Sequence, residues 1–147
     1  MARNFIQGIY TPKNPDRYVG TKRPMYRSSW EQTFMTFLDN HPSVINWASE
    51  PMKIPYMNPL TGKGTVYVPD FLMMYQHRTG AKIAELIEIK PLAQSQMREG
   101  KMKTHEQATV LKNHAKWAAA VKFCKNYGLT FRVLTEQDLF YMGGGRK

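Results

Sequence analysis

The stretch "VYVPDFLMMYQHRTGAKIAELIEIKP", residues 66–91, holds two apolar runs with charged residues in unusual places. Pro69-Asp70 falls inside the first run, and the second run ends in the tripeptide "EIK" at 88–90. Apolar runs of this length, with β-branched and aromatic residues, are typical of strands. The fold must therefore explain why two buried strands carry two carboxylates and a lysine.

A β-hairpin explains the spacing of these residues. The runs 66–75 and 82–90 flank the tripeptide "RTG", which suits a three-residue hairpin loop with Gly80 in the left-handed conformation. In that register Asp70 and Glu88 face each other across adjacent strands, with Cβ atoms ~5 Å apart. A slip of one residue would break this alignment, because side chains alternate between the two faces of a sheet.

The predicted hairpin also places a lysine beside the two acids. Lys90 lies two residues beyond Glu88 and points to the same face, whereas Ile89 points into the core. Two carboxylates this close repel each other unless a positive charge lies between them, and Mg²⁺ is a natural occupant. Lys90 could then orient or deprotonate an attacking water, or neutralise charge on a phosphate. The alternative is that Glu88 and Lys90 form an exposed ion pair at the end of a strand.

Composition limits the class of protein. The chain has 147 residues, enough for one domain, and its formal net charge is +10. This charge favours a polyanionic partner such as nucleic acid, although a basic protein without such a partner would have the same composition. The single cysteine, Cys124, excludes an intramolecular disulfide and a cysteine zinc cluster. Because there is neither a signal peptide nor a run of ~18 apolar residues, we expect a soluble intracellular protein without a membrane partner.

We predict three parts along the chain. Residues 1–27 hold three prolines and six basic residues against one acid, and they show no helical or alternating pattern. They therefore predict a basic N-terminal arm, which could lie on DNA or could be a solvated tail. Residues 28–142 form a single domain, and residues 143–147, "GGGRK", form a flexible tail.

The domain combines helices and strands. The predicted elements are a helix from Ser28 or Ser29 to His41, a strand broken by prolines at 43–57, a turn at 58–64, the two hairpin strands, a polar stretch at 91–103, a helix from Thr104 to Gly128, a strand at 129–135 and a short helix to 142. The inner face of the long helix is predicted to contain Val110, His114, Trp117, Val121 and Cys124. The order of the elements predicts one mixed α/β (α+β) domain.

Pro69-Asp70 followed by "EIK" matches the PD-(D/E)xK signature, so the chain resembles the restriction-endonuclease-like nucleases. The wider pattern is a Ser-x-x-Glu helix, then Pro-Asp-Phe, "EIKP", and a Lys-Trp helix that leads into "FCKNYGLTFRVLTEQDL". This pattern, over roughly residues 28–140, resembles the TnsA-type transposition endonucleases. The chain length and the small basic form look most like the head completion nucleases of T-even-type tailed phages.

The resemblance implies a mixed central β-sheet flanked by helices and the hydrolysis of DNA phosphodiesters with Mg²⁺, for which Mn²⁺ would substitute. It implies that Asp70, Glu88 and the main-chain carbonyl of Ile89 bind the metal, and that Lys90 acts on the nucleophilic water. In this superfamily a preceding helix often supplies a third acid, and Glu31 is the residue placed for that role in catalysis and metal binding.

Glu31 has a second interpretation. If Ser28 is the N-cap of the first helix, Glu31 is the reciprocal partner of a capping box. If Ser29 is the N-cap, Gln32 takes that place and Glu31 is free to turn toward the sheet. The sequence leaves both interpretations open.

Predicted DNA contacts come from residues outside the hairpin. Lys112 and Lys116 lie one turn apart on the long helix with Asn113 beside them, and Arg23 and Arg27 belong to the predicted arm. These side chains would bind phosphates of double-stranded DNA. A solvated helix face is the alternative for the residues on the long helix.

Two hypotheses for the function follow. The first is a Mg²⁺-dependent DNA nuclease that cleaves or trims packaged DNA during phage head completion and head–tail joining, in the host cytoplasm or the virion. The second is a basic DNA-binding or virion structural protein without catalytic activity. The set Asp70, Glu88 and Lys90 favours the first, because a binding protein has no need of paired carboxylates near phosphates. Contacts with capsid or neck proteins and a homodimer are further expectations.

Overall fold

The computed structural model describes residues 6–100 and 102–142, so the predicted tail at 143–147 lies outside the described residues. The strands of the central sheet are β3 (Val44–Ser49), β6 (Phe71–Gln76), β7 (Lys82–Ile89) and β8 (Thr130–Leu134). Their order is β3-β6-β7-β8. β6 is antiparallel to β3 and to β7, whereas β8 is parallel to β7, so the sheet is mixed.

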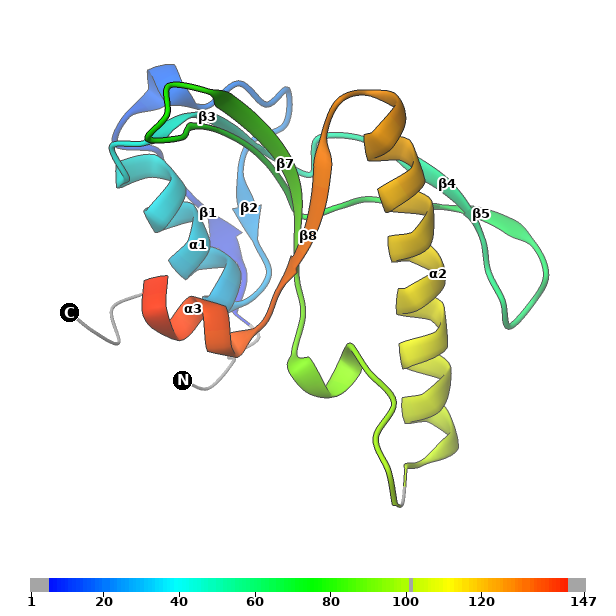
Figure 1. Cartoon of the computed structure of the whole chain (residues 1–147). Coiled ribbons are helices and arrows are strands. Elements are labelled where there is room, and N and C mark those ends of the chain that lie inside the picture. Colours follow the sequence, from blue (N-terminus) through cyan, green and yellow to red (C-terminus); the bar gives the residue numbers. More distant parts are fainter. Residues whose placement is uncertain (1–5, 101, 143–147) are drawn as a thin grey trace.

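Helices cover both faces of this sheet (Figure 1). α1 (Ser29–Asn40) and α3 (Glu136–Met142) lie on one side, and α2 (Thr104–Asn126) lies on the other. The smaller elements are β1 (Gly8–Ile9), η1 (Pro15–Arg17), β2 (Met25–Tyr26), β4 (Ile54–Met57), β5 (Gly64–Tyr67) and η2 (Leu92–Gln94). β1 pairs with β2 and β4 pairs with β5. The predicted α+β architecture, that of a restriction-endonuclease-like fold, is confirmed.

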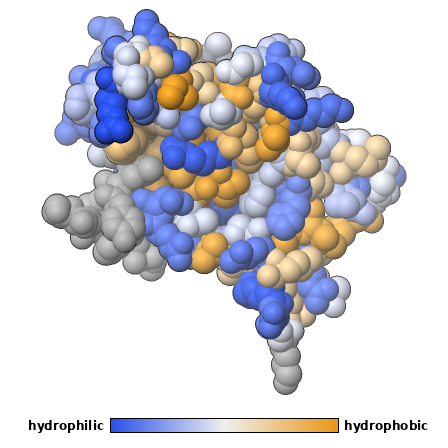
Figure 2. Space-filling view, viewed as in Figure 1, coloured by the Kyte–Doolittle hydropathy of each residue, from blue (hydrophilic) through white to orange (hydrophobic). Residues whose placement is uncertain are grey.

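The residues of β7 alternate between two hydrophobic cores. Ile87 and Ile89 pack with the apolar face of α1, whereas Leu86 packs in a second core that includes Ala120 of α2. Glu88 has the same parity as Leu86, so it belongs to the α2 side of the sheet. In the space-filling view of Figure 2, hydrophobic residues gather near the middle of the visible face and hydrophilic residues lie around them.

The predicted strand at 66–75 is divided into two strands. A bend at Pro69-Asp70 separates β5, which pairs with β4, from β6, which enters the central sheet. Proline has no backbone N–H for a ladder hydrogen bond, so the chain can leave one sheet and enter another at this point. The bend is what places Asp70 at the end of a strand and not within it.

The buried face of α2 agrees with the prediction only in part. Val110 and Cys124 are buried as predicted, whereas Asn113 and Ala120 are buried in place of His114 and Val121, which are exposed. Both sets recur at helical spacing, and the packing of β4 against the helix selects the face that contains Ala120. Neither α2 nor any other helix in the described ranges is long and apolar enough to cross a membrane.

Residues 6–27, expected to form an arm, pack against the rest of the protein. Tyr10, Tyr18 and Tyr26 lie against the first core, and Tyr18 forms a parallel bridge with Trp47 of β3. The aromatic rings of Tyr18 and Trp47 meet edge to face with their centroids 4.7 Å apart. This packing uses scattered tyrosines and no periodic apolar face, which is why no pattern in the sequence indicates it.

One buried acid fixes this N-terminal segment to α1. Asp39 is 0% exposed, and its carboxylate accepts hydrogen bonds from the Tyr10 hydroxyl at 2.7 Å, the Lys13 N–H at 2.7 Å and the Asn14 N–H at 3.0 Å. Burial alone would raise the pKa of the Asp39 carboxyl, but these hydrogen bonds together outweigh it and lower that pKa.

Replacement of Asp39 by alanine is expected to lower the free energy of unfolding by about 2–4 kcal/mol, because two main-chain N–H groups and a hydroxyl lose a charged acceptor. Asp16→Ala, at an exposed acid of the same segment, is the matched control and should change it by less than about 0.5 kcal/mol. Since the pKa of Asp39 is lowered on folding, its contribution is present at neutral pH and lost as the pH falls below about 4. Urea titrations of both variants would measure this, and equal stabilities would contradict it.

Candidate active site

The β6–β7 hairpin has the predicted register. Its last ladder pairs are Gln76 with Lys82 at the turn and Phe71 with Ile87 at the other end. The loop closes with a hydrogen bond of 2.7 Å from the His77 N–H to the Ala81 carbonyl, and Gly80 has φ 94°. The residues one step beyond Phe71 and Ile87 are Asp70 and Glu88. The register is therefore the predicted one, although the ladder ends before Asp70, and the charge of Glu88 acts on Asp70, so the two acids lie near each other.

Asp70 is anchored across the hairpin. Its Oδ2 accepts a hydrogen bond of 2.8 Å from the Ile89 N–H. Burial, followed by the negative charges of Glu88 and Glu31, raises the pKa of the Asp70 carboxyl well above its usual range, and the Ile89 N–H and the Lys90 ammonium offset this only in part. The effects of burial and of the two negative charges therefore outweigh that of the nearby Lys90 ammonium.

Glu88 is held through both of its carboxylate oxygens. It is 5% exposed, and its Oε1 accepts a hydrogen bond of 2.6 Å from the Tyr67 hydroxyl. Its Oε2 forms an ion pair with the Lys90 ammonium at 3.2 Å. Burial and the charge of Glu88 raise the pKa of Tyr67, so its hydroxyl keeps the proton that it donates. The prediction that Glu88 and Lys90 lie on one face is confirmed, but the pair is largely buried and not exposed.

Two further residues reach this site from other elements. Tyr67 ends β5, two residues before Pro69 of the bend, and no pattern in the sequence indicated a role for it. Lys116 of α2 places its Nζ 5.7 Å from the centre of the Tyr67 ring. Burial and then the positive charge of Lys90 lower the pKa of Lys116, while the charge of Glu88 acts in the opposite direction. Lys116, predicted only as a DNA contact, therefore lies close to the acid pair.

Glu31 combines features of both sequence interpretations. Ser28 is the N-cap of α1, because its Oγ accepts a hydrogen bond of 3.3 Å from the Glu31 N–H. The Glu31 carboxylate reaches back to accept a hydrogen bond of 2.8 Å from the Arg27 N–H, one residue before the cap. Glu31 is 8% exposed, and its charge still acts on Asp70. It therefore helps to fix the N-terminus of α1 and lies near enough to Asp70 for its charge to act on that acid.

The donor set suits a hard divalent cation with few protein ligands. Asp70 and Glu88 supply two adjacent carboxylates, and the Ile89 carbonyl follows directly in the chain. Among residues 6–100 and 102–142, no group of three or more His, Cys, Asp or Glu side chains is arranged to hold a metal ion. Mg²⁺ commonly binds through one or two carboxylates and completes its shell with water and substrate phosphate, so this set fits it. The third carboxylate expected from Glu31 is not gathered into such a group.

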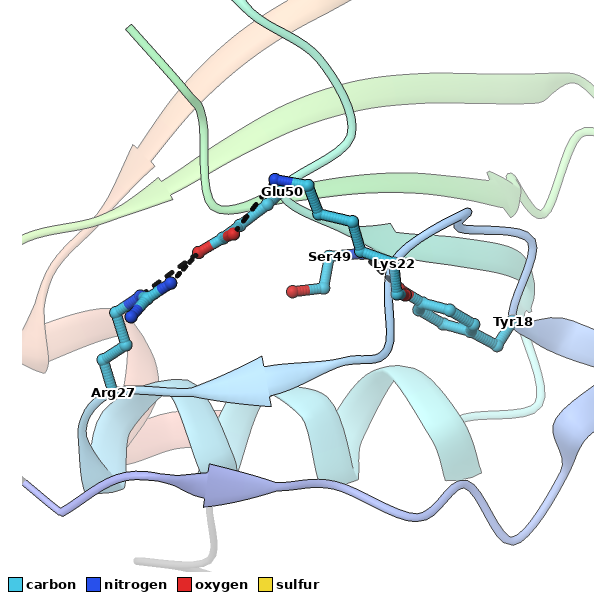
Figure 3. A network of polar contacts seen from close by, with 5 residues as sticks. All are labelled: Tyr18, Lys22, Arg27, Ser49 and Glu50. Carbon is cyan, nitrogen blue, oxygen red and sulfur yellow. Dashed lines mark hydrogen bonds and ion pairs between the residues drawn. The ribbon is translucent and has the colours of Figure 1, made fainter.

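The other predicted DNA contacts have different surroundings. Asn113 is 4% exposed and donates a hydrogen bond of 2.9 Å to the Gln94 carbonyl, so it fixes the stretch after β7 and does not face a partner. Lys112 is half-buried, and Arg23 is exposed. Arg27 is exposed and forms an ion pair of 3.1 Å with Glu50, as Figure 3 shows.

Comparisons with known proteins identify a matching family and a similar protein. A family model described as "TnsA-like endonuclease N terminal" matches residues 41–136, the part of the chain that holds the hairpin and α2. The head completion nuclease of Enterobacteria phage T4 is similar to this chain, with 35% identity over 146 residues, which cover 92% of this chain and 95% of that protein.

Proposed function

Because this chain belongs to the family of TnsA-like endonucleases, we propose that it is a Mg²⁺-dependent deoxyribonuclease that hydrolyses phosphodiester bonds in double-stranded DNA. The observation that carries the proposal is that Asp70 and Glu88 lie near each other at the end of one hairpin, beside the ammonium of Lys90. Two carboxylates in this position have no structural purpose that a hydrophobic pair would not serve better. They supply the oxygen ligands that a divalent cation requires.

Asp70, Glu88 and the Ile89 carbonyl would hold the cation. When bound, Mg²⁺ supplies positive charge at the phosphate and makes an attacking water more acidic. The Ile89 N–H fixes the Asp70 carboxylate, and the Tyr67 hydroxyl and Lys90 fix that of Glu88, so neither has to reorganise when the substrate arrives.

The lysines would act on the phosphate. The ion pair with Glu88 keeps the Lys90 ammonium in place, where it stabilises charge that develops on the phosphate or orients the attacking water. Lys116 adds a second positive charge from α2. Glu31 would orient water near Asp70, since the charge of Glu31 acts on that acid.

We place this activity in phage head completion, because the similar phage T4 protein bears that name. DNA of any sequence would be a substrate, since phosphate contacts by a chain of net charge +10 carry no sequence information. The same proposal includes three further points. The protein would act in the host cytoplasm or the virion, would contact capsid or neck proteins, and would form a homodimer.

The test is incubation of the purified protein with closed circular and linear DNA, in Mg²⁺, Mn²⁺ or EDTA. We expect circular DNA to be nicked or linearised in either cation and to stay intact in EDTA. Cleavage of linear DNA alone would identify an exonuclease. Binding of DNA without cleavage in either cation would contradict the proposal and favour a structural DNA-binding protein.

A further inference from the structure

Glu50 follows β3 directly and has an unusual backbone conformation. Its φ is 47°, and it is the one residue other than glycine with positive φ among the described residues. Side chains with a Cβ disfavour this region, and such residues concentrate at functional sites. The Glu50 N–H donates a hydrogen bond of 2.8 Å to the Asp70 carbonyl. The strained residue is thus attached to the main chain of an acid in the candidate site.

The Glu50 carboxylate holds two cations from the N-terminal segment (Figure 3). Its Oε2 accepts hydrogen bonds from Nη2 of Arg27 at 3.1 Å and from Nε of Arg27 at 3.2 Å. Its Oε1 pairs with Nζ of Lys22 at 3.6 Å. The side chains of Lys22 and Arg27 are 56% and 53% exposed, against 25% for Glu50. Glu50 is therefore the most buried side chain of the three, and the side chains of Lys22 and Arg27 are exposed to solvent.

Hydrogen bonds between side chains and main-chain groups fix this segment near Lys22 and at Arg27. The Tyr18 hydroxyl donates to the Lys22 carbonyl and accepts a hydrogen bond of 3.3 Å from the Ser49 N–H. The Arg27 N–H bonds to the Glu31 carboxylate at 2.8 Å. The backbone on both sides of the two cations is therefore held in place.

The contribution of these ion pairs to the stability of the protein is too small to explain the arrangement. Ion pairs with such exposed partners contribute little to the free energy of folding. The side chains of Lys22, Arg27 and Glu50 carry two positive charges and one negative charge, and the two positive charges are the more exposed. Nη1 of Arg27 has no hydrogen-bond acceptor among the described residues, and a phosphate oxygen can accept from it.

We propose that Lys22 and Arg27 form a phosphate-binding site for the DNA strand that enters the candidate active site, and that Glu50 is a positioning residue for both cations. The proposal rests on the proposed function, because DNA is the polyanion concerned. Glu50 holds the cations through its carboxylate and Asp70 through its N–H, so it sets the distance between the bound phosphate and the acid pair.

The first test is binding of a DNA duplex in EDTA, without cleavage, over a range of salt concentrations. The double variant Lys22→Ala/Arg27→Ala should bind about tenfold more weakly or worse, and its slope of log affinity against log salt should be smaller by about 2. Lys82→Ala/Arg78→Ala removes the same charges from the far end of the β6–β7 hairpin and is the matched control. An affinity and a slope equal to those of the control would overturn the proposal.

Thermal unfolding of each variant accompanies the titration. If the double alanine variant is unfolded, Lys22→Gln/Arg27→Gln replaces it, since glutamine can still bond to Glu50 without a charge. Because binding is measured in EDTA, the result stands apart from catalysis. A wild type that binds with the expected slope but never cleaves would contradict the proposed nuclease and leave the phosphate site supported.

The second test concerns Glu50. Glu50→Gln should bind DNA as tightly as the wild type or more tightly, because a negative charge is lost, but should cleave it about tenfold more slowly at saturating protein. Glu50→Gly relieves the backbone strain, so it should unfold at a higher temperature than Glu50→Gln and cleave no faster. Cleavage by both variants at the wild-type rate would show that Glu50 does not position the cations.

Discussion

Replacement of Lys90 by alanine is expected to slow DNA hydrolysis by roughly 10²–10⁴-fold, the usual effect of losing a positioned proton-transfer or charge-stabilising group. Lys90 lies directly after β7, its Nζ is 3.2 Å from Glu88, and its side chain is 19% exposed. It belongs to neither hydrophobic core and would not complete a metal's ligand set. DNA affinity should therefore stay nearly unchanged.

Single-turnover cleavage of supercoiled DNA in saturating Mg²⁺, beside a binding titration, measures this effect. Lys82→Ala, at the first residue of the same strand, is the matched control. Lys90→Met keeps the aliphatic stem and should lose activity to the same extent. The free energy of unfolding should fall by no more than about 1–2 kcal/mol, because the Tyr67 hydroxyl still donates to Glu88. Cleavage by Lys90→Ala at the wild-type rate would refute the catalytic interpretation of residues 88–90.

Asp70→Ala and Asp70→Asn are expected to abolish both cleavage and the stabilisation that a divalent cation gives to the wild type. At a cation concentration of 100 times its dissociation constant, the wild type should gain about 2.7 kcal/mol of stability. The asparagine variant keeps an acceptor for the Ile89 N–H, so it removes the negative charge with less change to the structure than the alanine variant does. Thermal unfolding with and without Mn²⁺ or Mg²⁺ measures the difference, with Asp16→Asn as the control. Equal stabilisation of wild type and variants would remove Asp70 from the metal site.

The same variant gives a prediction without metal. The pKa of Asp70 is raised on folding, so above about pH 4 this carboxyl binds a proton more tightly in the folded protein than in the unfolded chain. The stability of the wild type relative to Asp70→Asn should therefore fall as the pH rises from about 4 through the raised pKa. Asp70→Asn removes this titration and should be at least as stable as the wild type at neutral pH. A stability difference between the wild type and Asp70→Asn that does not change over this pH range would contradict the raised pKa.

The alignment of Asp70 with Glu88 could be predicted because it depends on local rules. A three-residue loop with a left-handed Gly80 fixes the register of two short strands, and alternation then places Glu88 and Lys90 on one face. The family resemblance drawn from these residues is confirmed by the matches with TnsA-like endonucleases and a phage nuclease.

Residues that depend on tertiary packing could not be predicted in the same way. Tyr67 reaches Glu88 only because the bend after β5 turns one sheet toward another. Asn113 and His114 both fit a helical repeat. The packing of β4 against α2 and the hydrogen bond from Asn113 to the Gln94 carbonyl decide which of the two is buried. Glu50 gives no signal in the sequence, since its position depends on a contact with Asp70 across the sheet.

The tight β6–β7 turn also bears on the order of folding. The hairpin pairs residues that are close in the sequence, so its closure has a small entropic cost and a hairpin forms within microseconds. The pairings of β3 with β6 and of β7 with β8 join segments much farther apart, and such long-range contacts are slow to form. Asp70 and Glu88 can therefore meet early, while Glu31 and Lys116 arrive with the long-range contacts that complete the domain.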